Sequence, residues 1–176
     1  MRDIAAAQLR LTCERTNVSH GSVAECVNRW MEHEPLAILP RCVQPGILEF
    51  FHACKARGLR LGALSDYPAE AKLRALGLAD LFDVVLCAQS PDIDVFKPNP
   101  RGLLVALERL DSGRAESLYV GDRVDVDAAT AEAAGVPCAI LTPHRPRNAH
   151  AAYTQVASYP QLRDLLWPAA PSGGVE

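Results

Sequence analysis

The fold is decided by residues 118–135, which read LYVGDRVDVDAATAEAAG. The apolar start of this stretch predicts a buried strand, and the alanine-rich run that closes on Gly135 predicts a helix. Asp122 then lies in the turn after the strand and Asp127 in the first turn of the helix, so both carboxylates can face one small volume. Because open α/β sheets bind ligands at the carboxyl ends of their strands, this turn is the first candidate for a functional site.

The two carboxylates allow two interpretations. Carboxylates held this close repel each other, and one takes up a proton unless a cation lies between them. Oxygen ligands favour a hard ion such as Mg²⁺, which accepts one or two carboxylates together with water and a substrate phosphate. Alternatively, Asp127 is a first-turn acid that stabilises the positive end of its helix, and Asp122 is an ordinary turn residue. The stretch on its own favours this structural alternative.

Composition narrows the class of protein. The chain has 176 residues, 49% apolar and 22% charged, which is enough for one full-sized core. A formal net charge of -3 gives no reason to expect binding to nucleic acid or to an anionic membrane, and no apolar run reaches the length of a membrane span. The six cysteines form no C-x-x-C pair and no zinc-binding spacing. These features, with no signal-peptide core at the N-terminus, predict a cytoplasmic protein.

The order of elements along the chain predicts a doubly wound, Rossmann-like α/β fold. Two helical patterns come first, one over residues 4–15 without a recognisable N-terminal cap and one introduced by a capping box at Ser22 and Glu25. From Pro45 onward, helices and short buried strands alternate, which is typical of a parallel sheet. The expected strands cover residues 59–64, 84–87, 118–120 and 138–141, and the expected helices cover residues 45–58, 69–76, 101–110 and 161–166. We expect a helical segment at 1–40, an α/β core at 41–167 and a flexible tail at 168–176.

Polar features fall at the ends of the expected strands. Ser65 follows one strand, and Lys97 precedes a helix in a segment stiffened by two prolines. A hydroxyl with neighbouring backbone amides can hold a phosphate oxygen, while a lysine neutralises charge between the phosphate and the acid pair. Each has an ordinary alternative, since Ser65 can be a turn residue and Lys97 a solvated cation. Their order along one α/β pattern predicts a site for phosphoryl transfer.

On these residues the chain resembles the haloacid dehalogenase (HAD) superfamily, specifically its phosphatase-like members with a helical cap. The matching segments are residues 44–46, 61–66, 96–100 and 121–127, within a resemblance that covers roughly residues 40–167. The resemblance implies that Ser65, Asp66 and Lys97 bind phosphate, with Ser65 and Lys97 acting in catalysis. It also implies a Mg²⁺ site at Asp122 and Asp127, with Asp122 as direct ligand and Asp127 in support. The substrate would be a small phosphorylated metabolite, and residues 1–40 would be the remaining part of the cap.

The first motif of this family has no counterpart in the chain. That motif is an apolar strand followed by Asp-x-Asp, which supplies the nucleophile and the general acid/base, yet Asp3 is the only aspartate before Ser65. The triplet Asp92-Ile93-Asp94 lies in a loop ahead of Lys97, and we expect no catalytic role for it. In the family the missing strand lies centrally, between the strands that end at Ser65 and at Asp122. We therefore expect exposed sheet edges that favour self-association.

Three hypotheses remain. The favoured one is an N-terminally truncated form of a Mg²⁺-dependent phosphatase that is inactive alone. The second is a non-catalytic module that binds phosphate and metal or has a regulatory role. The third is an active hydrolase that uses an unconventional acid or one supplied by a partner. The residues do not choose among small phosphomonoesters such as phosphoglycolate, sugar phosphates and nucleotides.

Overall fold

The strands of the protein pair in parallel and form two sheets. The computed structural model describes residues 3–142 and 152–168, so the tail expected at 168–176 lies outside the described residues from residue 169 onward. The strands are β1 (Gly62–Ser65), β2 (Val84–Cys87), β3 (Tyr119–Gly121), β4 (Cys138–Leu141) and β5 (Thr154–Val156). β1 pairs with β2 in one sheet, and β4 lies between β3 and β5 in the other. An α/β fold with parallel strands is confirmed.

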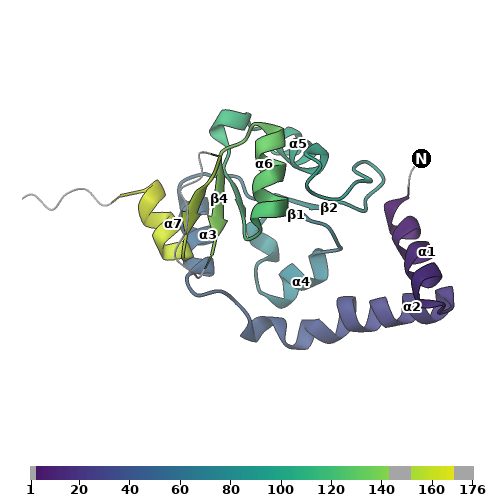
Figure 1. Cartoon of the computed structure of the whole chain (residues 1–176). Helices are drawn as coiled ribbons and strands as arrows, with labels where there is room; N and C mark the ends of the chain where they lie inside the picture. The colour runs from purple at the N-terminus through teal and green to yellow at the C-terminus, as the bar shows by residue number, and fades with distance from the viewer. Residues whose placement is uncertain (1–2, 143–151, 169–176) are drawn as a thin grey trace, which may run out of the picture.

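Helices cover both faces of the larger sheet (Figure 1). The core helices are α3 (Ile47–Ala56), α4 (Glu70–Ala75), α5 (Arg101–Arg109), α6 (Ala129–Ala134) and α7 (Tyr159–Leu166), with short helical turns at Ala79–Leu81, Arg114–Glu116 and Val124–Ala128. Ala139 and Leu141 of β4 pack in a cluster with α3 and α7, whereas Cys138 and Ile140 pack in a cluster with α6. This alternation buries every residue of β4, as expected for a parallel strand covered on both sides.

The two sheets meet at β1 and β3 without pairing. No backbone hydrogen bond joins these two strands in the part of the chain that the structure describes, and both strands are only partly buried. Side chains hold the sheets together instead. Leu61 and Val120 join the apolar cluster around α3, and Leu64 and Tyr119 join the cluster around α5. We call this junction the β1–β3 seam; the strand expected to lie there in the family stays a prediction.

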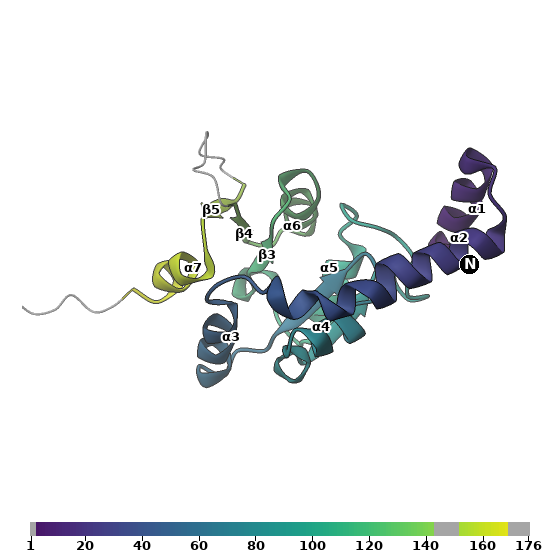
Figure 2. The same ribbon diagram turned by 90° about the horizontal axis from the view of Figure 1, so that it is seen from below.

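A helical arm precedes the core (Figures 1 and 2). It consists of α1 (Ile4–Thr16) and α2 (His20–Val27), continued by one π-helical and two 3₁₀ segments at Asn28–His33, Glu34–Ala37 and Leu39–Arg41. Val23 is the only buried residue of the described arm, whereas Trp30 and Ile38 are 59% and 56% exposed. Packing against the core therefore contributes little to this arm, and its polar contacts with the core carry more weight.

Two details of the arm correct the sequence predictions. The helix expected to begin without a cap is capped by Asp3, whose Oδ1 accepts a hydrogen bond from the Ala6 amide at 2.9 Å. The second helix begins earlier than expected, because Ser19 and not Ser22 is its N-cap; the Ser19 hydroxyl accepts from the Ser22 amide at 3.2 Å. Side-chain oxygens bound to free amides stabilise both helix starts.

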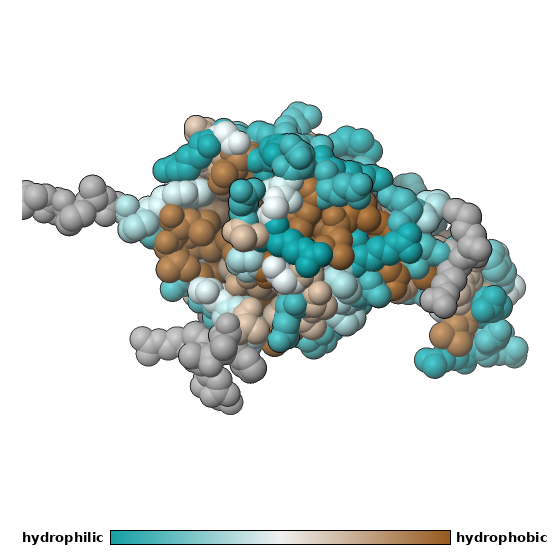
Figure 3. Space-filling view, turned by 90° about the horizontal axis from the view of Figure 1, so that it is seen from above, coloured by the Kyte–Doolittle hydropathy of each residue, from teal (hydrophilic) through white to brown (hydrophobic). Residues whose placement is uncertain are grey.

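The molecular surface is mixed in polarity. Seen from above, apolar side chains are exposed in patches between hydrophilic ones (Figure 3). Within residues 3–142 and 152–168, no helix combines the length and the apolar character that crossing a bilayer requires.

Candidate phosphate and metal site

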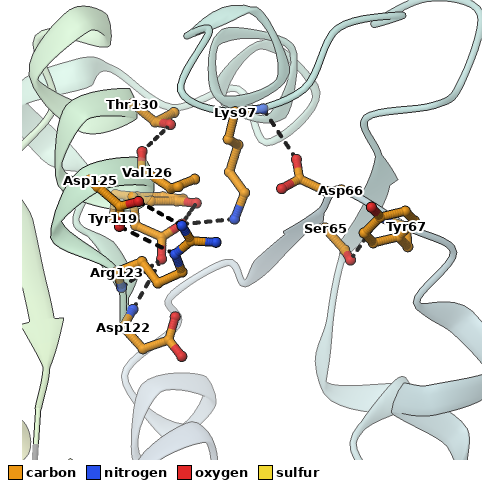
Figure 4. A network of polar contacts seen from close by, with 11 residues as sticks. Ser65, Asp66, Tyr67, Lys97, Tyr119, Asp122, Arg123, Asp125, Val126 and Thr130 are labelled. Carbon is orange, nitrogen blue, oxygen red and sulfur yellow. Dashed lines mark hydrogen bonds and ion pairs between the residues drawn. The ribbon is translucent and has the colours of Figure 1, made fainter. Parts of the chain in front are cut away.

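Loops bring the expected site residues to the carboxyl ends of the strands (Figure 4). Ser65 ends β1 and Asp66 follows it, Lys97 lies in the loop between β2 and α5, and Asp122 follows β3. Parallel pairing directs the strand ends of each sheet to the same edge, where open α/β sheets bind ligands. The site therefore lies beside the β1–β3 seam.

Asp127 is the centre of the polar network. The residue is 4% exposed and lies in the helical turn Val124–Ala128. Its Oδ1 accepts hydrogen bonds from Lys97 Nζ at 2.7 Å and from the Tyr119 hydroxyl at 3.1 Å. Its Oδ2 accepts from the backbone amides of Asp122 and Arg123, each at 3.1 Å. Four donors thus occupy the lone-pair positions that a carboxylate offers.

Gly121 makes the close approach of Asp127 possible. A methyl group at Gly121 would place its Cβ 2.3 Å from the Cβ of Asp127, which is far inside van der Waals contact. With no side chain at the end of β3, the Asp127 carboxylate can reach the amides of the following turn. Packing against Asp127 therefore explains why a glycine precedes Asp122 in residues 118–135.

Lys97 connects the ends of the two sheets. Its backbone N–H donates to Asp66 Oδ1 at 3.2 Å, and its ammonium donates to Asp127. The Lys97 and Asp127 side chains are only 15% and 5% exposed, so water screens their ion pair weakly. Burial raises the pKa of Asp127, but the hydrogen bond and charge of Lys97, together with the amides of Arg123 and Asp122, lower it by more, and the pKa lies below its ordinary value.

Ser65 lies at the expected strand end but outside this network. Its hydroxyl accepts a hydrogen bond from the Tyr67 amide at 3.2 Å, a bond within the same turn. Figure 4 shows Ser65 on the β1 side and the Lys97 ammonium on the side of Tyr119 and Asp122, where it donates to Asp127. The structure thus brings Asp66, Lys97 and Asp127 together, and the phosphate contact expected for Ser65 stays a prediction.

Asp122 and Asp127 differ in what they offer a metal ion. Asp127 is filled by four donors, one of them an ammonium, so it does not fit the role of a direct ligand. The Asp122 side chain is exposed, and Figure 4 draws no hydrogen bond or ion pair between its carboxylate and Lys97, which fits an ion that takes one carboxylate with water and phosphate oxygens. No group of three or more His, Cys, Asp or Glu side chains is placed to hold a metal among the described residues.

Comparison with known families identifies the scaffold. The sequence model of the haloacid dehalogenase-like hydrolase family matches residues 12–135. The chain belongs to this family. The match contains all the expected site residues, from Ser65 to Asp127, and it confirms the resemblance seen in the sequence.

The similar proteins of the HAD family include phosphatases. The chain is 39% identical over 121 residues to the phosphoglycolate phosphatase of Rhodospirillum rubrum, covering 65% of this chain and 48% of that protein. It is 33% identical over 152 residues to the phosphoglycolate phosphatase of Cereibacter sphaeroides, covering 81% of this chain and 66% of that protein. A HAD phosphatase from Thermococcus onnurineus has a similar fold, with a TM-score of 0.66 at 23% identity over 88% of this chain and 84% of that one. The chain thus spans about half to two thirds of the length of these two curated relatives.

Tyr119 is the member of the site that the sequence analysis missed. Its hydroxyl donates to Asp127, and burial, reinforced by the charge of that carboxylate, raises the pKa of Tyr119, so the phenol stays protonated at neutral pH. The available signal was a residue with a polar tip in an otherwise apolar strand, two positions before Gly121. Such a tip needs a hydrogen-bond partner when it is buried.

Proposed function

We propose that this chain is the scaffold of a Mg²⁺-dependent HAD phosphatase for small phosphomonoesters, and that it does not turn over substrate alone. The observation that carries the proposal is the position of Lys97. Its ammonium is held in a largely buried place at the strand ends by Asp127, and such a fixed cation is suited to stabilise the charge on phosphate oxygens. The phosphoglycolate phosphatases among the relatives support this class of substrate.

The contacts of the other site residues suggest how each would help to bind phosphate or Mg²⁺. One ammonium N–H of Lys97 binds Asp127, which leaves the others for a phosphate oxygen. Ser65 donates to the phosphate from the β1 side, and Asp66 fixes the Lys97 loop by accepting its backbone N–H. Asp122 holds Mg²⁺, which neutralises phosphate charge when it is bound. Asp127 holds the Asp122 turn through the backbone amide of Asp122.

The proposed inactivity concerns the nucleophile. Asp66 and Asp122 directly follow β1 and β3, but Asp66 accepts a hydrogen bond from the Lys97 backbone amide, and Asp122 has the role of metal ligand in this proposal. Attack on phosphorus requires a carboxylate that faces the phosphate held by the lysine. The β1–β3 seam lies where the family's first strand, with its Asp-x-Asp, is expected, and this supports the proposed truncation.

One observation favours a second candidate, a non-catalytic module that binds phosphate. The fully occupied Asp127 and its neutralising lysine form a stable polar network without a further ligand. Such a network can hold a phosphate between Lys97 and Ser65 without consuming it. The two candidates share a binding site and differ in whether a supplied nucleophile restores hydrolysis.

Calorimetry and a phosphatase assay test the proposal together. We expect inorganic phosphate, titrated in the presence of Mg²⁺, to bind the folded chain and to bind Lys97→Met more weakly, without hydrolysis of p-nitrophenyl phosphate by the chain alone. A synthetic apolar strand peptide that ends in Asp-x-Asp should restore hydrolysis to the wild type and not to Asp122→Asn. Failure of the peptide with intact phosphate binding favours the second candidate. Hydrolysis by the chain alone that Asp122→Asn abolishes would show that the chain is active, and absent phosphate binding would contradict both candidates.

Two further properties belong to the same proposal. The six cysteines are all free thiols, which supports a cytoplasmic location. The unpaired strands of the seam support self-association, because open edges invite pairing with another chain. Sedimentation at increasing protein concentration measures this self-association.

A further inference from the structure

The triplet Asp92-Ile93-Asp94 is a rigid part of the loop that leads to Lys97. Ile93 is fully buried, and Asp92 forms an ion pair with Arg109 of α5. The backbone of Asp94 has a φ of 48°, a left-handed conformation, and its amide donates to the Ser90 carbonyl at 2.8 Å. The burial of Ile93, the Asp92–Arg109 ion pair and the Asp94–Ser90 hydrogen bond therefore anchor the base of this loop.

The Asp94 carboxylate contacts the start of the helical arm. Its Oδ1 accepts a hydrogen bond from the backbone N–H of Ile4, the first residue of α1, at 2.9 Å. Asp3 caps the same helix from within the arm by binding the Ala6 amide. The helix start thus has one acceptor from its own segment and one from the core, and a negative charge there also stabilises the positive end of the helix.

Gln8 makes a second contact between α1 and the core, one helical turn after Ile4. Its side-chain amide donates to the Tyr67 hydroxyl at 2.9 Å, and its carbonyl oxygen accepts from Gln89 at 3.4 Å. Residues four apart lie on one helix face, so Ile4 and Gln8 present the same face of α1 to the loops after β1 and β2. No residue of α1 is fully buried, so these polar bonds make a large contribution to its place on the core.

We propose that Asp94 is the positioning residue that docks α1 of the arm onto the core loop that carries Lys97. Two residues, Val95 and Phe96, separate Asp94 from Lys97, and the Phe96 ring lies against the Tyr67 ring, with centroids 5.9 Å apart. One short segment thus holds the arm at one end and the polar network of the site at the other. The docking does not depend on phosphate or metal binding, so it can be tested even if the proposed function fails.

Hydrogen exchange of the α1 amides tests this docking in the whole chain. Asp94→Ala removes the acceptor, and Ile4→Pro removes the donor while keeping the helix, because proline is tolerated at the first helical position and Asp3 already has extended backbone angles. Asp94→Asn keeps an acceptor oxygen. Asp80→Ala, which removes an exposed carboxylate from the turn Ala79–Leu81, is the matched control.

We expect the α1 amides to exchange about tenfold faster in Asp94→Ala and in Ile4→Pro, because each loses a hydrogen bond to a charged group. Asp94→Asn should accelerate exchange less than Asp94→Ala, because it keeps the acceptor oxygen and loses only the charge. Asp80→Ala should stay close to the wild type, and the amides of β4 should be unchanged in all folded variants. Wild-type exchange of α1 in Ile4→Pro overturns the proposal, and so does equal acceleration in Asp94→Asn and Asp94→Ala. If Asp94→Ala fails to fold, Ile4→Pro still decides, because it alters no residue of the core.

Discussion

Replacing Lys97 with methionine isolates the charge at the centre of the site. Methionine keeps most of the apolar stem but removes the ammonium that binds Asp127. Leaving one partner of a buried ion pair uncompensated costs about 3–5 kcal/mol. Tyr119 and two backbone amides still bind the carboxylate, so we expect the lower end, about 3 kcal/mol. In a urea titration at pH 7 the midpoint should then fall by about 1 M or more.

The difference in unfolding free energy between the wild type and Lys97→Met should depend on pH, and this dependence identifies its cause. In the wild type the pKa of Asp127 lies below its ordinary value, so the contribution of the pair is present above about pH 4 and is lost as the pH falls through the folded-state pKa. In Lys97→Met, burial is no longer offset by a cation, so Asp127 binds a proton at a higher pH and is relieved of its unpaired charge. The difference in unfolding free energy should therefore be full at pH 7 and should shrink toward pH 4.

A double variant provides the control for the lysine experiment. With Asp127→Asn added to Lys97→Met, the amide oxygen can still accept from both backbone amides and no charge is left unpaired, so part of the stability should return. A difference that stays constant from pH 7 to pH 4, with no recovery in the double variant, would refute this reasoning. The cost would then come from lost packing of the lysine stem.

Three further changes test the fold by urea unfolding. Gly121→Ala should destabilise by about 1–3 kcal/mol or more, because its Cβ overlaps Asp127; wild-type stability would contradict this. Gly21→Ala should stabilise by about 0.5–1 kcal/mol, since no atom within 4 Å crowds a new Cβ in α2; a loss would mean that the arm packs differently. The hydrogen bond and charge of Lys55 help to lower the pKa of Asp83, so Asp83→Asn should destabilise at pH 7 and its effect should fade below about pH 4; a constant effect would exclude the charge as its cause.

Local patterns predicted the parallel core well. The strands Val84–Cys87 and Cys138–Leu141 agree with the prediction at both ends, because each is a short apolar run bounded by turn residues. β5 was not predicted, since Thr154 and Gln155 break the apolar pattern in a strand that pairs on one side only. Its pairing with β4 supplies the stability that its sequence does not signal.

The site was predicted as a set of residues and not as a set of contacts. Spacing placed Lys97 and Asp127 at strand ends, but it could not show that their side chains pair across 30 positions or that backbone amides fill the remaining oxygen of Asp127. The contact of Asp94 with Ile4 was not predicted for the same reason, because the two residues lie 90 positions apart. Contacts between distant segments depend on the assembled fold, which a local pattern does not contain.

The β1–β3 seam also bears on how the protein unfolds. Strands in one sheet share a ladder of backbone hydrogen bonds and lose it together. In the described structure β1 and β3 share no such ladder, and they are linked through side chains, helices and the hydrogen bonds of Lys97 to Asp66 and Asp127. Contiguous cooperative units of this kind can open at different free energies. We therefore expect β1–β2 and β3–β4–β5 to be two such units, coupled by the apolar clusters of the seam and by the two hydrogen bonds of Lys97.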